Sequence, residues 1–108
     1  EALGPWPVTG PTLEIGTKAF SDTSWITETR LRLRNDANLL DSIVKPRLGP
    51  ALGGTDLFRL YKTQDASIYN ELAAKGILTR TFTECPATLR IGLPPSNNGF
   101  ERLAKALF

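Results

Sequence analysis

The chain of 108 residues contains no histidine and only one cysteine, Cys85. Without histidine it cannot build a histidine-based catalytic triad, a histidine metal site or a histidine general base. A single cysteine supports neither a disulfide framework nor a zinc-binding cysteine cluster. We therefore expect no metal site, and the lack of disulfide pairs favours the reducing environment of the cytoplasm.

Strong charge of one sign and long apolar runs are also missing. The formal net charge is +2, with basic and acidic residues interspersed, which gives little support for nucleic-acid binding. No apolar run approaches the ~18 residues of a membrane span, and the first residues lack the pattern of a signal peptide. We therefore expect neither nucleic acid nor a membrane among the partners.

The composition that remains is globular, with 41% apolar and 22% charged residues in a length that suits one domain. Residues 1–11 are rich in glycine and proline, which predicts an irregular connector or a disordered end. Residues 12–21 and 25–48 have helical spacing, with an N-cap region at 21–24 and Gly49-Pro50 as the stop. Pairs of opposite charge are spaced to meet on the second helix: Glu28/Arg32, Arg32/Asp36 and Asp41/Lys45.

The remaining residues mix strand and helix patterns. Residues 57–62, 77–82 and 88–93 predict strands, the first after a Gly53-Gly54 turn signal. A short helix near residues 68–73, capped by Thr63 or Asp65, stops at Gly76, and Asn98 with Glu101 predicts the start of a last helix. This order predicts an α+β fold with a small, mainly antiparallel sheet and helices packed on one side.

Two arginines in these strands are candidates for binding an anion. Apolar residues at 89, 91 and 93 share one face, so Arg90 projects from the opposite face between small neighbours, and Arg80 sits similarly in 77–82. A guanidinium fork binds carboxylate or phosphate in bidentate fashion. From the residues alone, the favoured interpretation is that both arginines are solvated on the exposed face of a one-sided sheet, and Arg59 shows the same pattern.

Five motifs in order resemble a known family: GPWPVTGPTLEIG (4–16), TSWITETRLRL (23–33), GGTDLFRL (53–60), AKGILTR (74–80) and LRIGLP (89–94). Together they are similar to the C-terminal part of the threonine-phosphate decarboxylases of cobalamin biosynthesis, which are relatives of the histidinol-phosphate aminotransferases. The resemblance spans essentially the whole chain.

The resemblance implies a fold-type I enzyme that uses pyridoxal 5'-phosphate (PLP) and works as a homodimer. Residues 1–11 would be the linker from a PLP-binding large domain that precedes this chain, and residues 12–108 the C-terminal small domain. No lysine here has the family's Ser-x-x-Lys setting, so we expect no cofactor on this fragment and no activity from it alone. The reaction implied is decarboxylation of L-threonine O-3-phosphate, with PLP as the electron sink.

The resemblance also assigns roles to residues. Arg90 matches the clamp on the substrate α-carboxylate, and Arg80 matches the position that approaches the substrate phosphate. Trp6, Val8 and Thr9 match a segment near the cofactor, and no catalytic residue lies in this fragment.

Two alternatives stay open. The chain could be the small domain of a class I/II aminotransferase such as histidinol-phosphate aminotransferase, or a free-standing α+β binding domain without chemistry. The short loop between Arg80 and Arg90 favours the decarboxylase branch over the aminotransferases.

Overall fold

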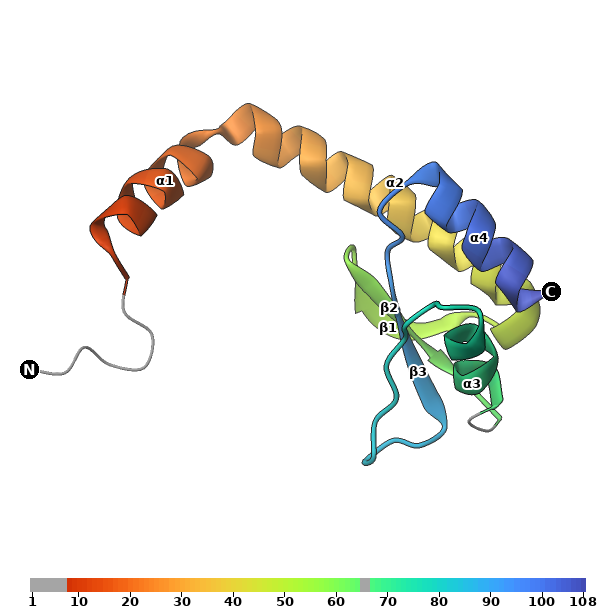
Figure 1. Ribbon diagram of the computed structural model, residues 1–108. Helices are drawn as coiled ribbons and strands as arrows, with labels where there is room; N and C mark the ends of the chain where they lie inside the picture. The colour runs from red at the N-terminus through yellow and green to blue at the C-terminus, as the bar shows by residue number, and fades with distance from the viewer. Residues whose placement is uncertain (1–7, 65–66) are drawn as a thin grey trace, which may run out of the picture. The chain divides into compact units, whose positions relative to one another are not determined.

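The computed structural model describes residues 8–64 and 67–108. These residues fall into two compact units, one extending to Leu31 and the other running from Arg32 to Phe108. In these described residues the predicted α+β class is confirmed, with helices and a three-stranded antiparallel sheet (Figure 1). The elements in chain order are α1 (Gly10–Ser21), α2 (Thr23–Leu48), β1 (Ala51–Thr55), β2 (Phe58–Lys62), α3 (Ser67–Ala74), β3 (Thr88–Gly92) and α4 (Asn97–Leu107).

Helix α1 lies in the first unit and begins two residues earlier than the predicted start at residue 12, because Pro11 is tolerated in a first helical turn. Thr9 caps it, its Oγ1 accepting a hydrogen bond from the Thr12 amide at 3.4 Å. The helix ends at Ser21, and the carboxylate of the following Asp22 accepts from the Trp25 amide at 3.0 Å and so caps α2. Helix α1 buries none of its residues within the described chain.

Helix α2 confirms the long predicted helix and continues through Pro46 to Leu48. Its Ala37, Leu40 and Val44 are fully buried. Of the three charge pairs predicted for this helix, only Arg32–Asp36 forms within the described residues, at 3.1 Å. The predicted Asp41–Lys45 pair is wrong because Asp41 turns toward the sheet instead.

The sheet has the order β1-β2-β3, and its register places Leu60 opposite Arg90 and Tyr61 opposite Leu89. The predicted turn at Gly53-Gly54 is wrong: these glycines lie inside β1, and the turn is at residues 56–57. Gly54 has φ of 147°, and a Cβ there would collide with the carbonyl oxygen of Phe58. Close approach of the neighbouring strand therefore explains this glycine better than a turn does.

The predicted strand at 77–82 is also wrong. This segment makes only an isolated bridge between Arg80 and Arg90, and its other residues make no ladder pairing among the described residues. A run of β-branched residues favours an extended backbone, but an extended segment becomes a strand only where a partner continues the ladder.

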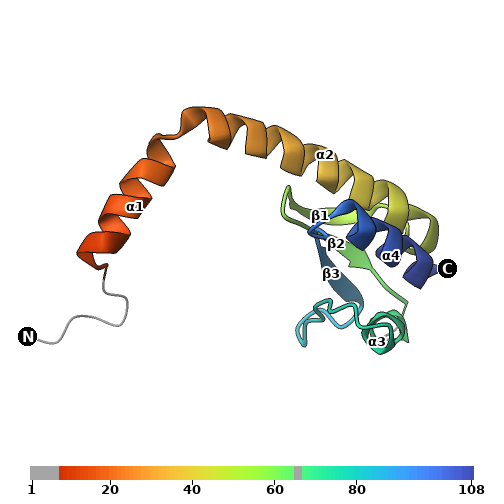
Figure 2. The ribbon, with the colours of Figure 1, turned by 45° about the horizontal axis from the view of Figure 1, so that its top comes forward.

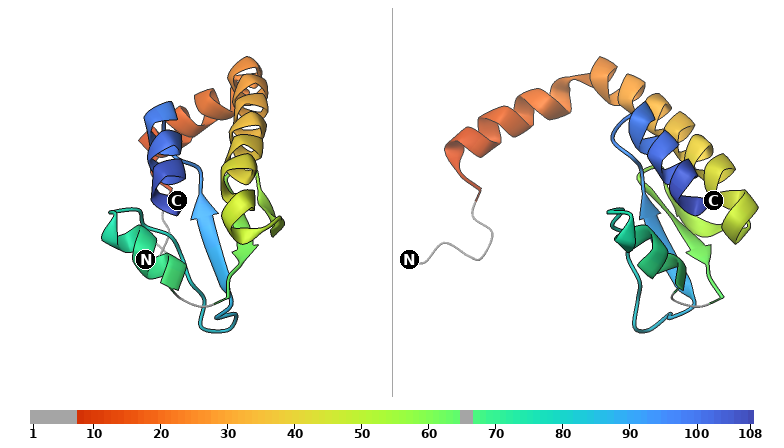
Figure 3. Two further views of the ribbon diagram at one scale, coloured as in Figure 1. Left: turned by 90° about the vertical axis from the view of Figure 1, so that its right-hand side faces the viewer. Right: turned by 45° about the vertical axis from the view of Figure 1, so that its right-hand side comes forward.

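The two faces of the sheet differ in what covers them. The face that carries Tyr61, Leu89 and Ile91 packs into one core with residues from α2, α3 and α4. Figures 2 and 3 show α2 and α4 on the same side of the sheet. The prediction that the helices pack on one side is therefore confirmed for this unit. We call this the helix-covered face; the opposite face, which carries Phe58, Leu60, Thr88, Arg90 and Gly92, is the open face.

The short helices differ little from expectation. Helix α3 is followed by Gly76, as predicted, with φ of 68°; Asp65, a predicted cap for it, lies outside the described residues. The predicted cap of the last helix at Asn98 is wrong. Ser96 caps α4 instead, since its backbone is extended and its Oγ accepts from the Gly99 amide at 3.3 Å.

Candidate functional site

Arg80 and Arg90 lie directly opposite each other. The Arg80 amide donates to the Arg90 carbonyl at 3.0 Å, and the Arg90 amide donates to the Arg80 carbonyl at 2.8 Å. Two residues that exchange both hydrogen bonds in an antiparallel pair project their side chains from the same face. The structure therefore brings the two candidate arginines together on the open face, which the sequence did not show.

Two phenylalanine rings contact these arginines. The Arg90 guanidinium carbon lies 5.0 Å from the centre of the Phe58 ring and 5.9 Å from that of Phe82. The Arg80 guanidinium carbon lies 5.4 Å from the centre of the same Phe82 ring. These distances are within the range of cation–π attraction. The Phe82 ring thus contacts both guanidinium groups.

The arginines border two hollows. An open depression of about 820 Å³ is lined by both arginines together with Leu57, Phe58, Tyr69, Leu78, Thr79, Thr81 and Gly92. A second hollow of about 420 Å³, over the open face, has mainly apolar walls that include Phe58, Leu60 and Phe82, with Arg90 at its border. Arg90 therefore lines both hollows, one of mixed and one of mainly apolar character.

Neither guanidinium has a counter-ion in the described part of the chain. Each ion pair there involves other basic residues, and no hydrogen bond to either guanidinium group occurs among the same residues. Two cations that line one depression without a carboxylate partner favour an anionic ligand there. Each fork keeps its N–H donors available for such a ligand.

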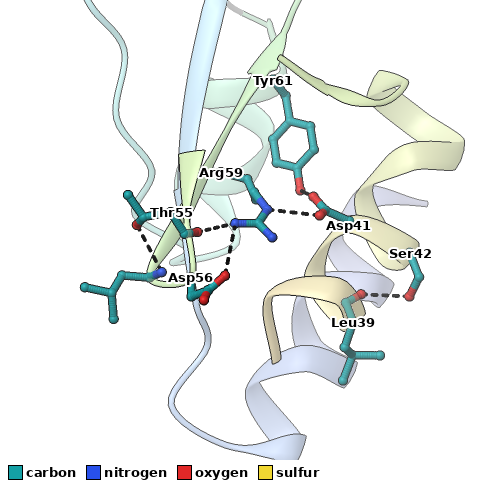
Figure 4. A network of polar contacts seen from close by, with 8 residues as sticks. Leu39, Asp41, Ser42, Thr55, Asp56, Arg59 and Tyr61 are labelled. Atoms are coloured by element: carbon teal, nitrogen blue, oxygen red, sulfur yellow. Dashed lines mark hydrogen bonds and ion pairs between the residues drawn. The ribbon is translucent and has the colours of Figure 1, made fainter. Parts of the chain in front are cut away.

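Arg59, the third arginine with this strand pattern, is different (Figure 4). It lies on the helix-covered face, where its Nε donates to Asp41 Oδ2 at 2.9 Å and its side chain is 15% exposed. The Tyr61 hydroxyl donates to Asp41 Oδ1 at 2.7 Å. Burial and the hydrogen bond to Asp41 raise the pKa of Tyr61 well above its usual value. This network joins α2 to the sheet, so Arg59 is a structural arginine.

Two of the residues expected near the cofactor, Val8 and Thr9, belong to the first unit. Trp6 lies outside the described residues. Val8 is 62% exposed, and the Thr9 hydroxyl is within 2.8 Å of the Thr12 hydroxyl besides capping α1. Their proximity to a cofactor stays a prediction.

The described residues also bear on metals and membranes. Among residues 8–64 and 67–108, no group of acidic and cysteine residues is arranged to hold a metal ion. No helix in the same part of the chain is both long and apolar enough to cross a membrane.

Sequence reasoning missed Phe58 and Phe82 as neighbours of the arginines. The signal for Phe82 was present, because residues two apart in an extended segment share a face, and Phe82 follows Arg80 by two. No such signal existed for Phe58, which reaches Arg90 only through the pairing of β2 with β3.

Comparison with known proteins confirms the resemblance drawn from the motifs. No protein-family model matches the chain. The chain is 39% identical over 108 residues to a threonine-phosphate decarboxylase of Pseudomonas aeruginosa, which covers 99% of this chain and 32% of that protein. It is also 39% identical over 107 residues to a threonine-phosphate decarboxylase of Sinorhizobium sp, covering 97% of this chain and 31% of that protein. The chain thus spans about a third of the length of these relatives.

Proposed function

We propose that this chain is the substrate-binding small domain of a PLP-dependent L-threonine-O-3-phosphate decarboxylase. The observation that carries the proposal is the pair Arg80 and Arg90, which line one depression and contact one ring without a counter-ion in the described residues. The similarity to two threonine-phosphate decarboxylases supports it. In this proposal residues 1–11 are the linker from the large domain and residues 12–108 form the small domain.

Each arginine binds one of the two anionic groups of the substrate. Arg90 is half-buried beside Phe58, so its fork is held in place and suits a bidentate grip on the α-carboxylate. Such a grip fixes the torsion about the bond that breaks, which is a positioning effect. Arg80 is more exposed and binds the phosphate group at the open depression.

The lysines of this chain do not fit the covalent anchor of PLP. None of them lines the depression at Arg80 and Arg90. Lys75 donates to the carbonyl of Ala106 at 2.7 Å, and Lys18 pairs with Glu14 at 3.2 Å. We therefore assign the cofactor and its chemistry to a part of the protein outside this chain, and expect the chain alone to be inactive.

We further propose that the complete enzyme is a cytoplasmic homodimer. The absence of disulfide-forming cysteine pairs supports the compartment. The chain spans only about a third of each similar decarboxylase, which supports a complete enzyme larger than this chain. Light scattering on the full-length protein tests the oligomeric state.

The decisive test is the release of CO₂ from L-threonine O-3-phosphate by the full-length protein. Replacing Arg90 with alanine removes a charge-assisted bidentate contact, so kcat/KM should fall by about a hundredfold. Arg30→Ala is the matched control, because Arg30 is exposed on α2 and makes no ion pair within the described residues. An unchanged kcat/KM in Arg90→Ala would contradict the clamp. Transamination of 2-oxoglutarate without CO₂ release would contradict the decarboxylase.

A further inference from the structure

We infer that Phe82 is a positioning residue of the anion site, holding Arg80 and Arg90 in the orientation in which both bind one ligand; this rests on the proposed function. In the described part of the chain, Phe82 is the ring that contacts both guanidinium groups, at 5.4 Å and 5.9 Å. Phe58 contacts Arg90 alone, at 5.0 Å.

The Phe82 ring offsets two unfavourable effects of placing two arginines at one site. Long arginine side chains lose rotamer freedom when they are fixed, and adjacent like charges repel each other. An aromatic face carries negative charge density and attracts a guanidinium group. A ring shared by Arg80 and Arg90 therefore reduces the repulsion and orients both forks before a ligand arrives.

The Phe82 ring is not part of the hydrophobic core. The core cluster is built from residues of the helices and the helix-covered face, and Phe82 is neither in it nor packed against it. Phe82 is half-buried on the wall of the apolar hollow over the open face. It also lies outside the strands, in the segment that leaves the bridge with Arg90. The core therefore does not require an aromatic residue here, whereas the contact with the two arginines uses the ring.

The inference predicts that binding depends on the aromatic face and not on apolar bulk. Phe82→Leu keeps an apolar side chain of similar volume but removes the ring, so Arg80 loses its aromatic contact and Arg90 keeps only that with Phe58. Phe82→Tyr keeps the ring. We expect Phe82→Leu to weaken binding by about fivefold to tenfold and Phe82→Tyr to retain it within about twofold.

The experiment measures the binding of inorganic phosphate to the full-length protein by calorimetry, and KM and kcat for CO₂ release from L-threonine O-3-phosphate. In Phe82→Leu, the Kd for phosphate and KM should rise by the same factor while kcat falls less. Phe108→Leu is the control, because Phe108 is 77% exposed at the end of the chain. Unchanged Kd and KM in Phe82→Leu would overturn the inference, and so would an equal loss in Phe82→Tyr.

A double variant tests whether Phe82 acts through the arginines. In an Arg80→Gln background the ring has one cation fewer to hold, so Phe82→Leu should weaken phosphate binding by no more than about twofold. The full factor in both backgrounds would show that Phe82 acts independently of Arg80, which overturns the inference.

These outcomes separate the inference from the proposed function. If the protein releases no CO₂ but phosphate binding depends on the ring as described, the proposed function fails and the inference stands. If CO₂ release requires both arginines while Phe82→Leu binds phosphate normally, the inference fails and the proposed function stands.

Discussion

The two faces of the sheet use arginine in opposite ways. On the helix-covered face, Arg59 is mostly buried and paired with Asp41 at 2.9 Å. On the open face, Arg80 and Arg90 stand beside phenylalanine rings and have no carboxylate partner in the described residues. The same residue type in the same strand pattern is thus structural on one face and available to a ligand on the other. The presence or absence of a counter-ion distinguishes the two roles.

The largest expected contrast between the faces is in stability. Leu89 on the helix-covered face is 1% exposed, so Leu89→Ala should lower the free energy of unfolding by about 3 kcal/mol. Leu60 on the open face is only half-buried, so Leu60→Ala should cost about 1 kcal/mol. Urea unfolding of the chain measures both. Equal losses would mean that the open face is as well packed as the other.

Disrupting the network of Asp41, Arg59 and Tyr61 on the helix-covered face should give the next largest loss of stability. Asp41→Ala leaves the Arg59 cation without its carboxylate and the Tyr61 hydroxyl without its acceptor. Since Asp41 is itself partly exposed, the loss should be about 2 kcal/mol, below that of a fully buried pair. Unfolding by urea checks this, with Glu28→Ala as the control, because Glu28 is exposed on α2 and makes no ion pair within the described residues. A loss no greater than the control's would remove the structural role of Arg59.

The smallest effect is a dependence of stability on pH at the alkaline end. The pKa of Tyr61 is raised in the folded chain by burial and by its hydrogen bond to Asp41. Below a tyrosine's usual pKa of about 10, both states keep the proton and the contribution of Tyr61 is fully present. Above it the unfolded state loses the proton first, so the free energy of unfolding should fall with rising pH, by at most about 1.4 kcal/mol per pH unit.

Two tyrosine variants separate the contribution of Tyr61 to this pH dependence of stability from that of other groups. Tyr61→Phe should remove this part of the alkaline decline, whereas Tyr69→Phe should leave it. Chemical unfolding at a series of alkaline pH values gives both slopes. Identical slopes for the wild type and Tyr61→Phe would show that the hydroxyl of Tyr61 does not control the decline.

The features that depend on local periodicity could be predicted from the sequence. Alternation at residues 89–93 correctly placed Arg90 opposite the core side chains, and helical spacing correctly predicted the long helix α2. Segments whose residue types occur in two kinds of structure were assigned to the wrong one. Gly53-Gly54 is typical of a turn, but here the pair lies in β1, where Gly54 allows the close approach of the neighbouring strand. The segment 77–82 has the composition of a strand but has only one pairing position on β3.

The site depended on contacts between distant residues, which one sequence does not show. Arg59 and Arg90 share the same local pattern, and only the register of β2 against β3, with Arg59 opposite Ile91, separates their faces. The bridge that joins Arg80 to Arg90 is likewise a tertiary contact. The resemblance to threonine-phosphate decarboxylases supplied the roles of these arginines, and those roles stay a proposal.

A crystal structure of the full-length protein with L-threonine O-3-phosphate bound tests the central claim most directly. The account predicts the α-carboxylate in a bidentate contact with Arg90 and the phosphate on Arg80, with N···O distances of about 2.7–2.9 Å. It also predicts that Arg59 stays paired with Asp41. A ligand that leaves Arg80 and Arg90 in solvent, or that binds Arg59 instead, would contradict it.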